Sequence, residues 1–230
     1  MRPLTIQPSM TEQVYDQILA EIIAGRLSDH PRLIQEDLAK TLGVSRQPVQ
    51  QALLLLRNQG ILRDAPGRGL VVAPIEAGFV RDLFEVRAAA EALACRLAAG
   101  RGSKQAAKLG PKFIEDGRKA ERDGSVFKLI AADKKFHEFL YDISGNRLIK
   151  ETMQPYWVHL RRLMGEVLLR DETPRRIWDQ HEAILQAIMR GNGTKAEDLA
   201  RTHITKAASV FIARIEKNAE ELNYAQSRAS

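Results

Sequence analysis

The chain has 230 residues, 44% of them hydrophobic and 6% aromatic, which is enough for two modest, mostly helical domains with separate cores. No apolar run reaches the roughly 20 residues that cross a bilayer, and the N-terminus lacks a signal-peptide pattern. The single cysteine, Cys95, excludes an internal disulfide. We therefore expect a cytoplasmic protein without a membrane partner. The net charge of +6 favours a polyanionic partner, and residues 45–69 concentrate it, with four arginines and one acidic residue.

The first part of the chain carries short helical patterns separated by turn signals. The hydrophobic spacing predicts helices at about 10–24, 35–42 and 46–59. Gly43 supplies a tight turn between the second and the third helix, Ser45 can cap the third, and Pro48 falls in its first turn. This order of residues predicts a helix-turn-helix.

The third predicted helix has two different faces. Its apolar positions recur at helical spacing and predict a buried face: Val49, Ala52, Leu53 and Leu56. Its polar side chains are left to point outward: Arg46, Gln47, Gln50 and Arg57. Amides and donors in the first turns of such a helix can read base edges in a major groove. An ordinary amphipathic helix of a bundle is the alternative, and the order of turn, cap and polar face favours DNA recognition.

A β-hairpin is predicted directly after this helix. Two apolar runs, 61–63 and 70–72, flank the Pro/Gly loop 64–69. Such a hairpin is a wing, and Arg68 at its tip could enter a minor groove or hold a phosphate, whereas a solvent loop with an incidental arginine is the alternative. We therefore expect a winged helix-turn-helix DNA-binding domain at 1–74, followed by a linker at 75–78.

The rest of the chain shows only helical periodicity. Helices are predicted at about 79–100, 104–122, 125–143, 147–169, 174–190 and 194–221. Pro111 and Pro155 fall inside two of them and predict a shortened or kinked helix in each case. The expected fold is mainly α, with an all-α antiparallel helical bundle at 79–222 and a frayed tail at 223–230.

Four polar side chains fall on the apolar faces of three of these helices: Asp133, His137, His181 and His203. Each alone could be a hydrogen-bonded core residue, but four buried polar groups cost too much unless they meet one another or a shared partner. A divalent metal ion is such a partner, with zinc as the first expectation and nickel, manganese or iron as alternatives. The remaining histidines, His30 and His159, are interpreted as surface or packing residues.

Arg87 lies on an apolar stripe of the helix predicted at 79–100, and a buried arginine needs an anion. Glu85 or Glu91 could supply that anion within the protein, and a bound organic acid is the functional alternative. Arg161 and Arg162 could also face a cavity. The sequence leaves these alternatives open.

Two groups of residues together carry a family resemblance. The first group comprises 32–39, 42–49, Ala52-Leu53 and Gly60-Ile61-Leu62. The second comprises 84–87 with Glu91, 133–137, Gly145-Asn146, His181 with Ile184 and 187–188, and His203-Ile204. A chain with both groups resembles a GntR-family transcription regulator of the FadR-type group with an FCD effector domain, in its smaller, six-helix variant. The resemblance covers nearly the whole chain.

The resemblance implies a homodimer that binds a double-stranded DNA operator with an affinity controlled by a small organic acid effector. It implies that the metal ligands are Asp133, His137, His181 and His203. Together with the helix pattern, it assigns DNA binding to Arg32, Ser45, Arg46, Gln47, Gln50, Arg68 and Gly69. Arg87 is the expected effector-binding residue.

Two positions depart from the family pattern. The family usually has an arginine where this chain has Gln50, and a small hydroxyl residue is common where it has Gln47. Arginine forms a bidentate contact with guanine, whereas glutamine pairs with adenine. The operator sequence of the family therefore does not carry over to this chain. We expect no enzyme activity. The alternatives are a metal-dependent hydrolase fused to a DNA-binding domain and a nonspecific architectural DNA binder.

Overall fold

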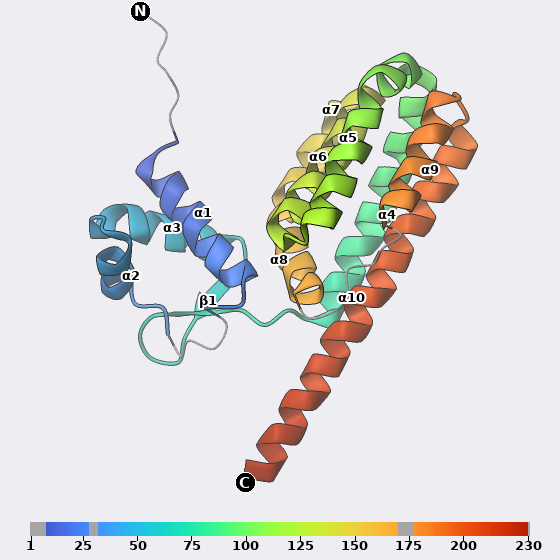
Figure 1. The fold of residues 1–230 in the computed structure, drawn as a ribbon. Coiled ribbons are helices and arrows are strands. Elements are labelled where there is room, and N and C mark those ends of the chain that lie inside the picture. The colour runs from blue at the N-terminus through green and yellow to red at the C-terminus, as the bar shows by residue number, and fades with distance from the viewer. Residues whose placement is uncertain (1–7, 28–31, 170–176, 230) are drawn as a thin grey trace, which may run out of the picture. The chain divides into compact units, whose positions relative to one another are not determined.

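The computed structural model describes residues 8–27, 32–169 and 177–229, and the chain divides into two compact units between Pro74 and Ile75 (Figure 1). The mainly α fold that the sequence predicts, with a winged helix-turn-helix before a helical bundle, is confirmed. The first unit consists of α1 (Met10–Ile23), α2 (Gln35–Leu42), α3 (Arg46–Asn58), β1 (Leu62–Asp64) and β2 (Leu70–Val72).

α1 begins at a capping box. The Glu12 amide donates to the Ser9 hydroxyl oxygen at 3.2 Å, and the Ser9 amide donates to the Glu12 carboxylate at 2.6 Å. This arrangement satisfies two amides that have no partner within the helix. The buried face of α1 packs against α3 and consists of Val14, Ile18, Leu19, Ile22 and Ile23.

The turn between α2 and α3 has the geometry that its sequence predicts, with one correction. Gly43 ends α2 with φ +65°, a left-handed conformation that favours glycine. Ser45 occupies the N-cap of α3, but its side chain accepts no hydrogen bond from the helix, so the expected hydroxyl cap is wrong. Pro48 stands at the third helical position and lacks one of the two N–H groups from which an N-cap hydroxyl can accept.

The wing is a two-stranded antiparallel hairpin. β1 pairs with β2 so that Leu62 lies opposite Val72, one residue later than the apolar run predicts at its start. The Leu33 amide donates to the Leu70 carbonyl at 2.7 Å, which ties the hairpin to the segment before α2. The loop turns at Gly67 and Gly69, whose φ angles of +91° and +96° favour glycine.

The second unit is a helical bundle. Its elements are α4 (Ala77–Arg101), α5 (Ser103–Asp123), α6 (Val126–Ser144), α7 (Arg147–Met153), the 3₁₀ turn η1 (Gln154–Tyr156), α8 (Trp157–Leu168), α9 (Ile177–Met189) and α10 (Gly193–Ala229). The helix predicted at 147–169 is thus divided by a turn that contains Pro155, whereas α5 continues through Pro111.

Both ends of this unit differ from the expected boundaries. α4 begins at Ala77, inside the predicted linker, because the Val80 amide already donates to the Glu76 carbonyl. α10 continues to Ala229, past the start of the predicted tail, because 219–229 contains good helix formers and neither glycine nor proline.

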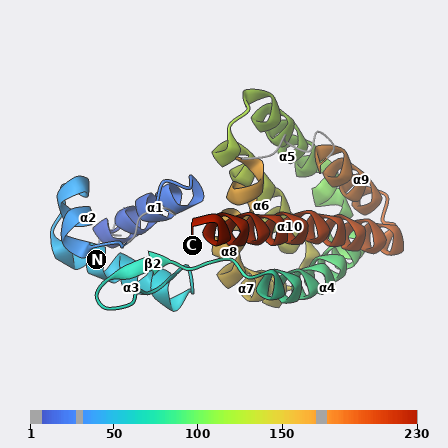
Figure 2. The same cartoon turned by 90° about the horizontal axis from the view of Figure 1, so that it is seen from below.

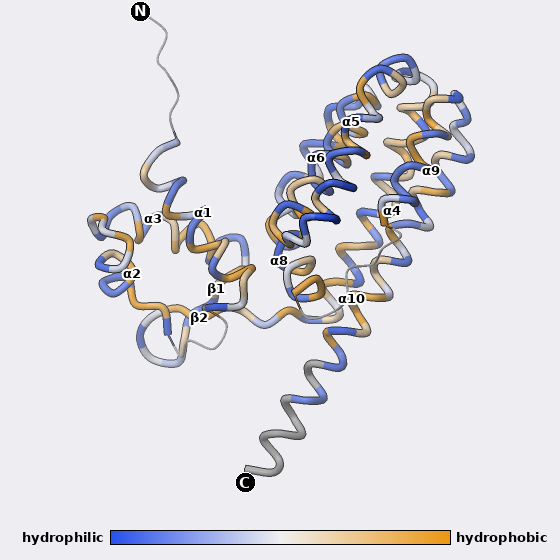
Figure 3. The backbone as a smooth tube through the Cα atoms, in the orientation of Figure 1, coloured by the Kyte–Doolittle hydropathy of each residue, from blue (hydrophilic) through white to orange (hydrophobic). Residues whose placement is uncertain are grey.

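α10 lies antiparallel along α4 and also packs against α9, although α4 and α10 are far apart in sequence (Figure 2). α5 and α9 approach closely because α5 has glycines at the contact: a Cβ added at Gly117 would lie 2.1 Å from the Trp178 ring. The described helices alternate hydrophobic and hydrophilic residues (Figure 3), and none of them combines the length and apolar character that would span a membrane.

Candidate nucleic-acid interface and metal centre

In the first unit, α2, α3 and the wing enclose an open groove of about 580 Å³. We call it the reading groove, and its polar lining includes Arg32, Arg46, Gln50, Arg57 and Arg68. These residues come from three segments that only the fold brings together. The groove therefore gathers most of the positive charge that the sequence concentrates after Ser45.

Three of these arginines have partners within the unit. The Arg46 guanidinium pairs with Glu36 of α2, and Arg57 Nη2 lies 2.7 Å from Asp64 Oδ2. Arg32 Nη2 donates to the Pro66 carbonyl at 2.9 Å. These exposed contacts orient the arginines but hold them weakly, because solvent screens surface ion pairs. Each guanidinium can therefore exchange its partner for a phosphate or a base.

Two predicted base-reading residues, Gln47 and Gln50, are exposed and make no hydrogen bond to any described residue. The neighbouring Gln51 differs, because its Oε1 accepts a hydrogen bond from the Thr11 hydroxyl at 2.7 Å. Ser45, Arg68 and Gly69 are exposed as well. The predicted DNA-contacting residues thus share the exposed side of α2, α3 and the wing.

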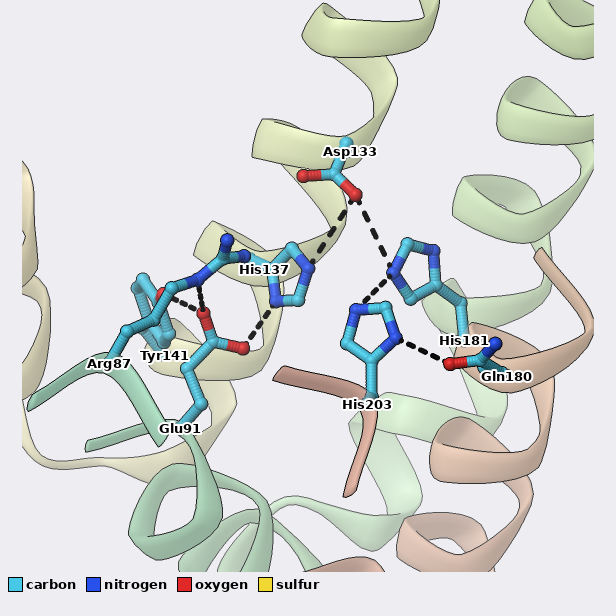
Figure 4. A network of polar contacts seen from close by, with 8 residues as sticks. All are labelled: Arg87, Glu91, Asp133, His137, Tyr141, Gln180, His181 and His203. Atoms are coloured by element: carbon cyan, nitrogen blue, oxygen red, sulfur yellow. Dashed lines mark hydrogen bonds and ion pairs between the residues drawn. The ribbon is translucent and has the colours of Figure 1, made fainter. Parts of the chain in front are cut away.

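In the second unit, the four predicted metal ligands meet at one place (Figure 4). Asp133 and His137 come from α6, His181 from α9 and His203 from α10, and all four are buried. Each imidazole offers one nitrogen to a group that spans no more than 4.8 Å. Asp133 Oδ1 lies 3.5 Å from His181 Nε2 and 3.7 Å from His137 Nε2.

These distances fit a divalent metal ion. His181 Nε2 and His203 Nε2 are 3.1 Å apart. Ligands about 2.1 Å from a tetrahedral zinc ion are about 3.4 Å from one another, a value close to the separations of 3.1, 3.5 and 3.7 Å and shorter than the 4.8 Å over which the imidazole nitrogens spread. Imidazole and carboxylate are also the donors that zinc and related ions accept. The cluster could therefore hold a metal ion with little rearrangement.

Outer oxygen atoms face two of the three imidazoles. Glu91 Oε2 lies 2.6 Å from His137 Nδ1, and His203 Nδ1 lies 2.9 Å from Gln180 Oε1. In each ring the nitrogen that faces an oxygen is Nδ1, so Nε2 is turned toward the other ligands. Metal-binding histidines typically have such an outer oxygen, which selects the tautomer with its lone pair on the metal side.

Glu91 is itself anchored in the core. Its Oε1 accepts hydrogen bonds from Arg87 Nε at 2.6 Å and from the Tyr141 hydroxyl at 2.8 Å. The structure thus identifies Glu91 as the protein partner of buried Arg87, and Glu85 is exposed. Sequence reasoning named Glu91 as a possible partner of Arg87 but missed Tyr141 and the link to His137.

The electrostatics follow from this packing. Burial opposes protonation of His137, but Glu91 and Asp133 outweigh it and raise the pKa of His137 to about 9. Burial, reinforced by nearby His137, lowers the pKa of His203 to about 4. Burial alone would raise the pKa of Glu91, yet Arg87 and His137 hold it well below its usual range. Glu91 is therefore a carboxylate in this core.

The other singled-out residues are not members of the cluster. His159 packs against the Phe79 ring at 4.8 Å, and His30 lies outside the described residues. Arg161 is half-buried and Arg162 is buried, where desolvation lowers the pKa of its guanidinium.

Comparison with known proteins matches both units. The model of the gntR family of bacterial regulatory proteins matches residues 10–72, and the FCD domain model matches residues 82–206. An uncharacterized HTH-type transcriptional regulator of Bacillus subtilis (strain 168), YdhC, is 27% identical over 194 residues, covering 83% of this chain and 86% of its own. The B. subtilis regulator LutR is 27% identical over 203 residues, which are 80% of this chain and 92% of LutR.

Solved structures share the fold. Escherichia coli McbR/YncC superposes with a TM-score of 0.74 at 22% identity, covering 90% of this chain and 99% of that one. A GntR regulator from Rhodococcus sp. RHA1 gives a TM-score of 0.71 at 21% identity, over 88% and 97% of the two chains.

Proposed function

We propose that this chain, which belongs to the GntR family of bacterial regulatory proteins and carries an FCD domain, is a transcription regulator. Its affinity for the operator would be controlled by a small carboxylate bound beside a metal ion. The family makes it a non-enzymatic, HTH-type transcription regulator. The observation that carries the rest of the proposal is the buried cluster of three imidazoles and one carboxylate inside the helical unit.

The DNA half of the proposal rests on exposed groups of the first unit. Arg46, Gln47 and Gln50 would contact base edges, since donors and amides near the N-terminus of a recognition helix reach the major groove. The Ser45 hydroxyl, which caps nothing, is available to a phosphate. Arg32 and Arg68 (with Gly69 beside it) would contact the backbone or the minor groove from the wing side.

The regulatory half rests on the second unit. Asp133, His137, His181 and His203 would hold a divalent ion, with zinc first and nickel, manganese or iron as alternatives. Such an ion would supply a buried positive charge and open coordination positions that suit a carboxylate. Arg87 is the proposed second contact of that carboxylate, which would have to compete with Glu91 for it.

We also propose a homodimer. One recognition helix reads only a few base pairs, and helix-turn-helix regulators reach useful specificity by binding two half-sites about 34 Å apart. Light scattering of the purified protein would report a single mass of two chains, and a mass of one chain at micromolar concentration would contradict this part.

A metal-dependent hydrolase is not supported by the relatives described above, which are transcriptional regulators. The chemistry of the cluster agrees with that result. Glu138, the carboxylate nearest in sequence to His137, is paired with Lys134 one helical turn before it, and it is not positioned as a general base.

The DNA-binding half is tested with Arg46→Ala. We expect this variant to lose specific retardation of the DNA upstream of the chain's own gene in the presence of competitor DNA. Arg26→Ala is the matched control, because it removes the same charge from an exposed arginine that pairs with Glu21 of α1. Specific binding by Arg46→Ala at the wild-type level would remove Arg46 from the reading role. Loss of all specificity in the wild type would favour an architectural DNA binder.

The metal half is tested by elemental analysis of protein purified without chelators. We expect about one divalent ion per chain in the wild type. His181→Ala should lose this ion, and His159→Ala, which removes an imidazole outside the cluster, should keep it. A wild-type protein that neither carries nor takes up a divalent ion would refute the metal site.

A further inference from the structure

The exposed face of α3 contains an apolar residue in the middle of its polar groups. Leu54 is 50% exposed and lines the reading groove with Arg46, Gln50 and Arg57. The leucine just before it, Leu53, also borders the groove but is buried, with 5% of its surface exposed. Single exposed leucines are common, so exposure alone means little. The position of Leu54 within the groove is what sets it apart.

The helix geometry places Leu54 between the two free glutamines. At about 100° per residue, Leu54 lies about 40° round the helix from Gln50 and about 20° from Gln47. Leu54 follows Gln50 by one turn and Gln47 by two, so the three side chains form one strip along the helix. We call these three residues, Gln47, Gln50 and Leu54, the uncharged strip.

The charged side chains of α3 lie at one edge of this strip. Arg46 and Arg57 are both farther round the helix than Gln50, and they pair with Glu36 and Asp64 respectively. Charge is thus held at the margin of the strip, next to α2 and the wing. The centre of the reading face offers two amides and one apolar side chain.

This chemistry matches A·T base pairs. A glutamine amide can bond adenine at N6 and N7 together, and an apolar side chain can contact the C5-methyl group of thymine. A G·C pair under Leu54 would instead bury the amino group of cytosine against an apolar surface without a partner, which is costly. The strip therefore favours adjacent A·T pairs and disfavours G·C pairs at the same positions.

We propose that Gln50 and Leu54 read neighbouring A·T base pairs in each half-site, Gln50 by bonding adenine and Leu54 by contacting a thymine methyl group. This inference rests on the proposed operator binding and adds the class of base pair that the operator carries at those positions. Leu54 is then a specificity-determining residue beside the proposed base contact of Arg46, and Arg57 at the margin would contribute affinity that is largely independent of sequence.

The test begins with selection of binding sites from random double-stranded DNA by the full-length wild-type protein. In the selected site, each thymine is then replaced in turn by deoxyuridine, which lacks only the methyl group. We expect replacement at one position of each half-site to weaken wild-type binding about fourfold, the value of one buried methyl group. Leu54→Ala should bind the thymine and deoxyuridine sites equally well.

Leu55→Ala is the matched control, since Leu55 is 45% exposed on the same helix but does not line the groove. It should keep the wild-type difference between thymine and deoxyuridine. Gln50→Arg should shift the preferred base next to the methyl-sensitive thymine from adenine to guanine, by about 5- to 150-fold in relative affinity. Both leucines are exposed, so neither alanine variant should impair folding.

Two outcomes would overturn the inference while leaving operator binding intact. One is a selected site whose affinity is the same with thymine or deoxyuridine at every position. The other is a methyl effect that Leu54→Ala retains, which would assign the methyl contact to a different residue. A selection that enriches no sequence would instead overturn operator binding itself.

Discussion

Glu91→Gln separates a metal-orienting role of Glu91 from a purely structural one. The substitution keeps the size of a side chain that is 2% exposed and removes its charge. Oε2 then no longer presents a carboxylate to His137 Nδ1 at 2.6 Å. A glutamine can turn its NH₂ group toward Nδ1, which would leave the proton on Nε2 and block the nitrogen that faces the other ligands.

Two effects of this variant can be given magnitudes. Loss of an outer oxygen that orients a ligating histidine typically weakens metal binding 10- to 100-fold, which is about 1.4 to 2.7 kcal/mol. The variant also deprives Arg87, 3% exposed, of its carboxylate. Removing one partner of a buried ion pair costs about 3–5 kcal/mol of folding stability, an upper limit here because the amide oxygen can still accept from Arg87 Nε.

The assay is competition for zinc with a chromogenic chelator, run beside urea unfolding of the metal-free protein. Tyr141→Phe is the control, because it removes the hydroxyl bond to Oε1 and leaves Oε2 facing His137. It should lose about 1 kcal/mol of stability and keep nearly the wild-type zinc affinity. If Glu91→Gln loses stability yet binds zinc as tightly as the wild type, Glu91 serves only as the counterion of Arg87 and the reasoning fails.

Three further substitutions have defined outcomes. Ser9→Ala removes the capping hydroxyl of α1 and should cost about 1 kcal/mol in urea unfolding of the first unit; an unchanged midpoint would contradict the capping role. Gly117→Ala forces a Cβ against Trp178 and should cost about 1–3 kcal/mol, whereas Gly100→Ala, with open space around its Cβ, should cost nothing. Burial keeps the pKa of His203 at about 4 in the folded protein, so between about pH 6.5 and about 4 only the unfolded chain takes up this proton. We therefore expect the melting temperature of the metal-free protein to fall over this pH range. His203→Gln should make this fall smaller. A variant with the wild-type slope would contradict this assignment.

The sequence predicts the first unit well because its signals are local. The spacing of apolar residues in α1 and α3, the glycine turn and the Pro/Gly loop each act within a few residues, and each appears in the structure close to the predicted place. The error at Ser45 is also local. A serine before a helix predicts a cap, but Pro48 removes one of the two N–H donors that could form it.

Only part of the polar core of the second unit could be predicted from the sequence. Helical periodicity places Asp133, His137, His181 and His203 on buried faces, and burial is what the structure shows for all four. The role of Glu91 could not be predicted, because it depends on how α4 crosses α6 and on where Tyr141 lies. Contacts between helices far apart in sequence leave no periodic signal in either helix.

Leu54 illustrates a different limit of predicting base-reading residues from the sequence. Sequence reasoning looked for donors and amides on the reading face and did not consider Leu54. Leu54 interrupts the buried spacing of Val49, Leu53 and Leu56, so the spacing itself could have marked it as exposed. The base pairs of DNA carry an apolar group as well as polar edges, and a search for reading residues should include leucines that leave the buried stripe.

The charges of the buried cluster are the reason to expect a carboxylate effector beside the proposed metal ion. In the metal-free core, Arg87 and protonated His137, whose pKa is about 9, balance the carboxylates of Glu91 and Asp133, so the charges sum to zero. Ligating imidazoles are neutral, so a bound divalent ion would displace the His137 proton and bring the sum to +1, and one bound carboxylate would return it to zero. A buried net charge is costly, so the carboxylate would relieve the excess positive charge that the ion brings. An uncharged ligand of the same shape would lack this gain.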